Sequence, residues 1–406
     1  MLKKHFNTTL AAPIFIVVLL TAFPAFSDTA FGPKQYTRTA GAPCPCRDTF
    51  NAFGGTGNLI IENGNTGGDH HITSAEIYLN GIKILGSHDF KRVVHQMEKT
   101  VPLRNGSNTL NVVVRGKPGS YITAFVTVPS PITLNITSPS DGGIILKPDI
   151  LVEGTFVNAS GRETGVVVNG VASSISGGNF VSNHIPLAEG QNTITATATD
   201  ENGSSASVSI KVNAETAGNY IQLSAIPDSG LPLFQTTLNV GGSFGFTEST
   251  IIHTGPDQVE ILENTNINEH TAKMTTPGIY YFTGKVSNAS DQIYTDTIAV
   301  QVFDGAELDT LLRAKWMGMR QALVQNDIPT AASFFIESKK NAYREIFTAL
   351  SSKLPQISHA LDDIQLIKIT YNSAEYDIRT THNGHIYSYP LRFVKDTDGL
   401  WKIKSF

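Results

Sequence analysis

The sequence is short of the features that mark enzymes and nucleic-acid-binding proteins. Only 16% of its 406 residues are charged, the formal net charge is −5, and there are two tryptophans. It contains no Walker loop or dinucleotide fingerprint. Nucleic-acid binding needs a basic surface, which this charge balance does not favour. We therefore expect no catalytic residues, no cofactor and no nucleic-acid partner.

Cysteine is almost absent. The only two, Cys44 and Cys46, lie in "APCPCRDTF" with one proline between them. Redox pairs carry two residues between the thiols, often at a helix start, so this spacing does not favour thiol chemistry. Two cysteines are also too few for a disulfide framework. A local disulfide between Cys44 and Cys46, or two free thiols, is the expectation.

Long hydrophobic runs are missing except at the start, "MLKKHFNTTLAAPIFIVVLLTAFPAFSDTA". Two lysines precede the apolar run 10–23, and the triplet Ala25-Phe26-Ser27 after it has small residues at both ends, which predicts a signal peptide over residues 1–27. A membrane anchor needs about 20 apolar residues, whereas this run is shorter and contains Pro13. The prediction is a secreted or periplasmic protein with no stable membrane anchor in the mature chain.

What the sequence does have is a repeat. The stretch "VPLRNGSNTLNVVV" (101–114) returns as "IPLAEGQNTITATA" (185–198), and each copy follows an alternating strand that ends in Asn-Gly. Asn-Gly favours a tight hairpin turn. Two β-sandwich modules, 31–128 and 132–212, are therefore predicted. In a superposition, Asn80-Gly81 should match Asn169-Gly170, and Asn108-Thr109 should match Asn192-Thr193.

Two segments resemble known sandwich families. Through "ITSPSDGGIIL", "VVVNG" and "IPLAEGQNTITATATDENG", the second module resembles bacterial immunoglobulin-like modules of secreted and surface proteins. Residues 219–303, with "IPDSGLPL" and "IYYFTGKVS", resemble the polycystic-kidney-disease-type repeat, although "SFGFTEST" lacks both aspartates of that family's signature. These resemblances imply sandwich folds but no reaction, because the scaffold hosts many functions.

The pattern changes after residue 304. Apolar residues recur every three or four positions, which predicts one helical face, and Asp304 and Asp327 are expected to cap helices. The predicted apolar positions of the first helix are Leu308, Leu312, Trp316, Met319 and Leu323; those of the second are Ala332, Phe335 and Ile336; those of the third are Tyr343, Ile346, Phe347 and Leu350.

Four strands should follow these helices. In "HIYSYPLRFV", Tyr387, Tyr389, Leu391 and Phe393 share one face, which the Trp316 helix should cover. This order and the closing "DTDGLWKIKSF" resemble the nuclear-transport-factor-2-like, or cystatin-like, superfamily, which implies a curved sheet around a helix over residues 306–406. The predicted fold class is multidomain: tandem all-β immunoglobulin-like sandwiches followed by an α+β helix-on-curved-sheet domain.

The candidate ligand pocket lies in this last domain. The resemblance implies a conical cavity, and Trp316, Tyr376, Tyr387 and Tyr389 would line it. The alternative is that these aromatics simply fill the core, because interiors are normally close-packed.

Metal sites are not predicted. His70 and His71, in "GGDHH", point to opposite sides of an extended segment, and neither their spacing nor that of His88 and His95 matches a zinc site. Calcium at Asp200, Glu201 and Asp228 is an alternative. Tight turns explain such acids equally well.

Three functions are compatible with these features. The first is a modular binding or adhesion-type protein without catalytic activity, whose partner is an extracellular or periplasmic protein or glycan. The second is an enzyme or small-ligand-binding protein acting through the C-terminal cavity, where a tyrosine, His382 or His385 would serve as acid or base. The third is a carbohydrate-binding module protein, which would need exposed aromatics in a row.

Overall fold

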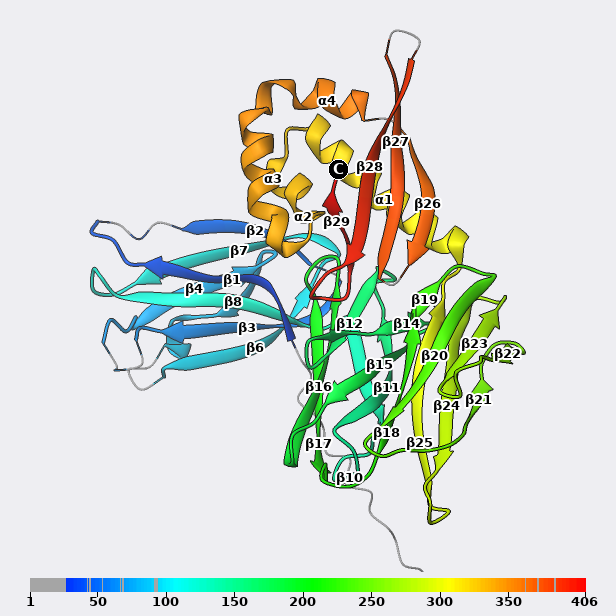
Figure 1. The fold of residues 1–406 in the computed structure, drawn as a ribbon. Helices are drawn as coiled ribbons and strands as arrows, with labels where there is room; N and C mark the ends of the chain where they lie inside the picture. The colour runs from blue at the N-terminus through cyan, green and yellow to red at the C-terminus, as the bar shows by residue number, and fades with distance from the viewer. Residues whose placement is uncertain are drawn as a thin grey trace, which may run out of the picture. The chain divides into compact units, whose positions relative to one another are not determined.

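The computed structural model describes residues 27–41, 43, 45–52, 54–65, 67, 69–90, 94–361, 363–370, 372–382 and 385–406. All but the last residue of the predicted signal peptide, and Cys44, lie outside these described residues. The chain divides at Pro129 into two compact units (Figure 1). Each unit is described by itself.

The first unit is a β-sandwich. One sheet has the strand order β1-β8-β3-β6 and the other β2-β7-β4-β5. Buried residues alternate along the inner strands, so both sheets face one core of aliphatic and aromatic side chains. The elements are β1 (Ser27–Thr37), β2 (Cys46–Ala52), β3 (Gly55–Asn63), β4 (Ser74–Leu79), β5 (Ile82–Leu85), η1 (Ser87–Asp89), β6 (Gln96–Leu103), β7 (Gly106–Arg115) and β8 (Tyr121–Pro129).

The second unit begins with another immunoglobulin-like sandwich. Its sheets have the orders β10-β17-β16-β12-β13 and β14-β15-β11-β9. The elements are β9 (Ile132–Ser138), β10 (Gly143–Ile145), β11 (Asp149–Asn158), β12 (Thr164–Val168), β13 (Val171–Ala172), β14 (Ser174–Ser176), β15 (Asn179–Pro186), β16 (Gly190–Asp200) and β17 (Ser205–Ala214).

The inner strands of these two sandwiches correspond. The order β7-β4-β5 matches β16-β12-β13, and the pair β3-β6 matches β11-β15. The edges differ, because β17 lies beside β16 whereas β2 takes that place beside β7. The closing strand β8 pairs instead with β3 in the opposite sheet, where β9 pairs with β11. The repeated sequence therefore corresponds to the inner strands, whereas the edge strands of the two sandwiches differ.

The Asn-Gly turns have the conformation that the sequence predicts. Asn80 and Gly81 have φ values of 52° and 85°, and Asn169 and Gly170 have 45° and 88°. Positive φ at both central residues defines the tight hairpin turn that Asn-Gly favours. The hairpins β4–β5 and β12–β13 are confirmed.

The second Asn of each repeat also has one role in both copies. Asn108 exchanges two hydrogen bonds with the backbone of Arg104, and Asn192 does the same with Ala188. The pairing between the two turns differs, however, since the amide of Asn80 donates to Thr109 O while that of Asn169 donates to Thr195 O. Superposing the two Asn-Gly turns therefore leaves Asn108 and Asn192 two residues out of register, and the prediction that both pairs superpose together is wrong. A shift of two keeps the same face buried, since side chains alternate with period two.

A third sandwich repeats the arrangement of the second. Its sheets have the orders β18-β20-β23-β22 and β19-β25-β24-β21, and the short strand β19 runs parallel to β25 as β10 does to β17. The elements are β18 (Ile221–Ile226), β19 (Ser229–Gly230), β20 (Phe234–Gly242), β21 (Ser249–Thr254), β22 (Glu260–Glu263), β23 (Glu269–Met274), β24 (Gly278–Ser287) and β25 (Ile293–Val302).

The C-terminal part is the α+β domain. Helices precede an antiparallel sheet of order β26-β27-β28-β29, and α1 lies against one face of that sheet (Figure 1). The elements are α1 (Gly305–Val324), α2 (Ile328–Ser333), α3 (Glu337–Ala349), η2 (Ser351–Lys353), α4 (Leu354–Ala360), β26 (Ile364–Thr370), β27 (Ser373–His382), β28 (His385–Lys395) and β29 (Trp401–Ser405).

The caps predicted for these helices are confirmed. The Asp304 carboxylate accepts from the amides of Ala306 and Glu307, and Asp327 accepts from Thr330. The predicted second helix is too long, because α2 ends at Ser333 and Phe335 instead bridges to Ile403 of β29.

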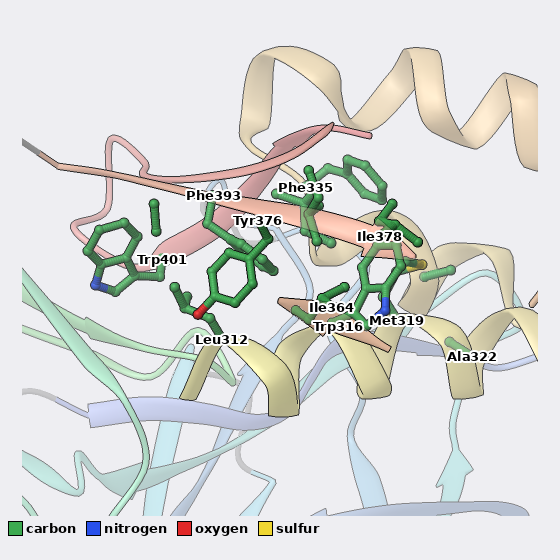
Figure 2. Packing of buried hydrophobic residues seen from close by; sticks show 14 of the residues in the cluster. Leu312, Trp316, Met319, Ala322, Phe335, Ile364, Tyr376, Ile378, Phe393 and Trp401 are labelled. Atoms are coloured by element: carbon green, nitrogen blue, oxygen red, sulfur yellow. The ribbon is translucent and has the colours of Figure 1, made fainter. Parts of the chain in front are cut away.

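The core of this domain joins α1 to the sheet. Figure 2 shows the buried side chains of α1 beneath residues from β27 and β28. All five predicted apolar positions of α1 are buried. None of the helices in the described part of the chain combines the length and hydropathy that a membrane span requires.

Candidate functional site

The structure does not gather the four predicted pocket residues around one space. Trp316 and Tyr376 are each 1% exposed and belong to the core, whereas Tyr387 and Tyr389 are 44% and 52% exposed. Tyr389 lies opposite Ile378 in the β27–β28 pairing, towards the tip of that hairpin. Of the face predicted on β28, Leu391 and Phe393 are buried as expected, whereas the prediction that the Trp316 helix covers Tyr387 and Tyr389 is wrong. A ligand role for these residues stays a prediction.

The buried tyrosine has a carboxylate partner. The hydroxyl of Tyr376 donates to Asp309 Oδ1 at 2.9 Å, and Asp309 also pairs with Arg313 one turn later. Burial, followed by the hydrogen bond to Asp309, raises the pKa of Tyr376 far above its usual range. The phenol thus stays protonated and ties β27 to α1. His385 is exposed at the start of β28, and nothing is described of the His382 side chain.

The remaining candidates lie apart from one another. Cys46 is exposed at the start of β2, and its pairing with Cys44, which lies outside the described residues, stays a prediction. His71 packs against His95 and His70 against Tyr121. Asp200 accepts from two amides of its own turn. Within the described residues, no three His, Cys, Asp or Glu side chains gather as a metal site; whether calcium binds stays a prediction.

A different cavity is present in the second unit. It has a volume of about 470 Å³ and lies where the second sandwich, the third sandwich and the α+β domain meet. Each contributes to its wall, including Glu163 and Ile175 from the second sandwich, Gln301 and Phe303 from the third, and Leu311, Lys395 and Trp401 from the α+β domain. Such a volume falls in the range of small-molecule sites, about 300–1,000 Å³.

One wall of the cavity is fixed by an ion-pair cluster in which Lys315 and Glu163 are buried and Glu201 is exposed. The ammonium of Lys315, on α1, lies 2.5 Å from Glu163 Oε2 and 2.9 Å from Glu201 Oε1. Glu163 Oε1 also accepts from the amide of Trp401 at 2.9 Å. Burial raises the pKa of the Glu163 carboxyl. The cluster therefore joins the second sandwich to two separate elements of the α+β domain.

A second lysine lines the cavity itself. Lys395 Nζ donates to Ser173 O at 3.0 Å and lies 5.8 Å from the centre of the Phe303 ring. Burial lowers the pKa of Lys395 to about 8. Its side chain thus contacts both sandwiches from the last residue of β28.

Two glycines let the backbones of two domains touch. A Cβ on Gly165 would lie 2.3 Å from Asp398 O, and one on Gly399 would lie 2.9 Å from Val166 N. Gly399 also has a φ of 78°, in the turn between β28 and β29. Only glycine fits between these backbones, so this contact sets how closely the α+β domain approaches the second sandwich.

The two sandwiches of this unit are joined in a similar way. Asn183 exchanges hydrogen bonds with the backbone of Ala299, both at 2.8 Å. Within the second sandwich, His184 Nδ1 lies 2.9 Å from Asp149, and this hydrogen bond raises the pKa of His184. Gln222 of the third sandwich donates to the same Asp149 carboxylate. Lys147 pairs with the buried Asp296 across the same junction. Polar contacts therefore hold the cavity walls on more than one side.

Sequence reasoning missed this site, although three of its residues carried a signal. Lys315 stands seven residues after Leu308, inside the apolar stripe of α1, and Lys395 continues the alternation of Leu391 and Phe393. Gln301 is the polar residue in the otherwise apolar run "IAVQV". Lys315 and Lys395 are polar side chains at positions whose pattern points inward, and Gln301 interrupts a run that is apolar on both faces of its strand. Glu163 lies in a turn and carried no such signal.

Comparison with known proteins gives one family match. The model described as glucodextranase, domain B, matches residues 131–216, which are the second sandwich. No curated protein matches the chain at a significant level.

Among solved structures, the fibronectin(III)-like modules of Clostridium thermocellum CbhA are 12% identical, with a TM-score of 0.17, over 42% of this chain and 94% of that one. The tandem Ig repeats of Dlar are 9% identical, with a TM-score of 0.21, over 43% and 97%. Latent PorU from Porphyromonas gingivalis is 11% identical, with a TM-score of 0.26, over 68% and 34%. The strand orders above identify the modules as immunoglobulin-like sandwiches, and the second of them is similar to domain B of glucodextranase.

Proposed function

We propose that this is an exported modular binding protein that holds its ligand in the three-domain cavity and performs no chemistry on it. The observation that carries the proposal is the construction of residues 130–406. Three domains are joined by buried ion pairs and hydrogen bonds, and a cavity of about 470 Å³ stays open between them. A rigid, preformed cavity favours binding because little ordering is needed when the ligand enters.

The identity of the domains supports a role outside the cytoplasm. The strand order of residues 219–303 is compatible with a polycystic-kidney-disease-type repeat. The order of helices and strands in residues 306–406 is compatible with the nuclear-transport-factor-2-like superfamily. Tandem sandwiches of this kind suit adhesion or surface binding. The similarity of the second sandwich to domain B of glucodextranase favours a glycan over a protein as the partner.

Binding without turnover can be tested with a mixed panel of neutral sugars, acidic sugars, amines and short peptides. We expect at least one compound to raise the thermal midpoint of the purified protein, because a ligand that binds only the folded state stabilises it. Chromatography should recover that compound unchanged after prolonged incubation. A panel that yields no stabilising compound, or a compound that is converted, would count against the proposal.

Export has its own test. The charged start, the apolar run and the small residues near Ser27 predict cleavage there. N-terminal sequencing of protein recovered from outside the cytoplasm should begin within a few residues of Asp28. Recovery of the chain from membranes with Met1 still in place would refute export with cleavage.

A further inference from the structure

The polar groups of the cavity are mostly hydrogen-bond acceptors. Glu163, Asp304, Glu307 and Gln301 belong to the lining, together with Lys395 and the hydroxyl-bearing Thr164 and Ser176. The carboxylates of Glu163 and Asp304 already accept from backbone amides of the protein. Carboxylates accept hydrogen bonds and repel anions. The negative charge of the lining therefore disfavours an acidic ligand, and its acceptors favour a ligand with N–H or O–H donors.

Gln301 is the lining residue that most specifically favours a hydrogen-bond donor on the ligand. Its side chain is only 6% exposed, and its Nε2 donates to Ile175 O at 2.7 Å. That bond fixes the amide orientation, because the opposite assignment would bring two oxygens together. Over the part of the chain that the structure describes, Gln301 Oε1 has no hydrogen-bond partner. A buried acceptor left unpaired costs about 1–3 kcal/mol. Neighbouring atoms cover Gln301 Oε1, so a ligand donor that displaced this cover and reached the atom would recover that free energy.

Lys395 favours a hydrogen-bond acceptor on the ligand, in contrast to the donor that Gln301 favours. Its ammonium has three donors, of which one is used by Ser173 O. The others favour an acceptor oxygen on the ligand and disfavour a ligand cation. Phe303, Leu311 and Pro277 line the cavity as apolar surface. The ligand therefore carries donors, acceptors and an apolar face, without net charge.

We propose that the cavity binds a neutral sugar unit, with one hydroxyl donating to Gln301 Oε1 and another accepting from Lys395 Nζ. A hydroxyl both donates and accepts, and the C–H face of a pyranose packs on apolar side chains. Acidic sugars are excluded by the carboxylates of the lining. This inference rests on the proposed function and names its ligand class.

The test compares sugars that differ only in charge. Saturation-transfer NMR and calorimetry on the purified protein would use glucose, galactose and maltose, with glucuronate and galacturonate as acidic counterparts. We expect at least one neutral sugar to bind, and its acidic counterpart to bind at least about tenfold more weakly, a difference of about 1.4 kcal/mol. Equal affinity for the acidic counterpart would overturn the assignment.

Two variants locate the site. Gln301→Leu removes the unpaired acceptor, and Leu311→Phe fills the cavity while leaving every hydrogen bond of the junction intact. Both should lower the affinity at least about tenfold. Gln235→Leu, at an exposed glutamine of β20, is the matched control and should bind normally. Tryptophan fluorescence separates loss of binding from loss of folding.

The outcomes distinguish the inference from the proposed function. If amines or peptides bind and Leu311→Phe blocks them, while the neutral sugars do not bind, the binding function stands and the sugar assignment fails. If a neutral sugar binds and Leu311→Phe does not weaken it, the assignment to this cavity is overturned. If nothing in either panel binds, both are wrong.

Discussion

Lys315→Met should destabilise the α+β domain by about 3–5 kcal/mol, the usual cost of removing one partner from a buried ion pair. Lys315 is 8% exposed and lies between Glu163 and Glu201. Methionine fills a similar volume, so the loss comes from the buried Glu163 carboxylate left without a counter-charge, whereas Glu201 is exposed to water. Both tryptophans of the chain, Trp316 and Trp401, lie in this domain. A denaturant titration followed by tryptophan fluorescence therefore measures the effect directly.

Two further variants show whether the lost charge of Lys315 causes the loss of stability. Adding Glu163→Gln to Lys315→Met should restore part of the lost stability, because one uncompensated carboxylate is removed. Lys273→Met breaks the exposed pair with Glu260 and should cost less than about 1 kcal/mol, as surface ion pairs do. If Lys315→Met and Lys273→Met have equal effects, the buried cluster does not hold the junction.

Gly165→Ala should open the junction between the second sandwich and the α+β domain. The added Cβ would lie 2.3 Å from Asp398 O and 2.4 Å from Gly399 C. Both are backbone atoms, so no side-chain rotation relieves the overlap and the two domains must move apart. Overpacking of this kind costs about 1–3 kcal/mol. Limited proteolysis should cleave near Phe303 faster than in the unchanged protein, and the cavity ligand should bind more weakly.

Gly218→Ala is the matched control for this experiment. A Cβ at Gly218, in the segment between the second and third sandwiches, would meet nothing within 4 Å. Its proteolysis and ligand binding should be unchanged. Unchanged proteolysis in Gly165→Ala would mean that the backbone contact at Gly399 does not fix the position of the α+β domain.

The local structure was well predicted because it depends on neighbours in the sequence. The Asn-Gly hairpins follow from the tolerance of these residues for positive φ, and the caps at Asp304 and Asp327 follow from the free amides of a helix start. The apolar stripe of α1 was read correctly for the same reason, since its period belongs to one helix.

Edge strands were less predictable from the repeat. The copies 101–114 and 185–198 form equivalent inner strands. The strand that follows each copy differs, because β17 pairs with β16 in the same sheet, whereas β8 pairs with β3 in the sheet opposite β7. Which strand completes an edge depends on the chain that precedes the repeat, because β2 already occupies the place beside β7. A local motif carries no information about such a distant competitor.

The sequence by itself determined the modules, their turns and the buried face of α1, because each depends on periodicity and conformational preference over a few residues. Only the tertiary structure decided the cavity and its charges. Lys315, Lys395 and Gln301 are polar side chains at the junctions between domains, and their partners Glu163, Ser173 and Ile175 come from another domain. Long-range packing brings these groups together. Because a charged or polar group away from water is costly without a partner, burial makes their pairing important for stability.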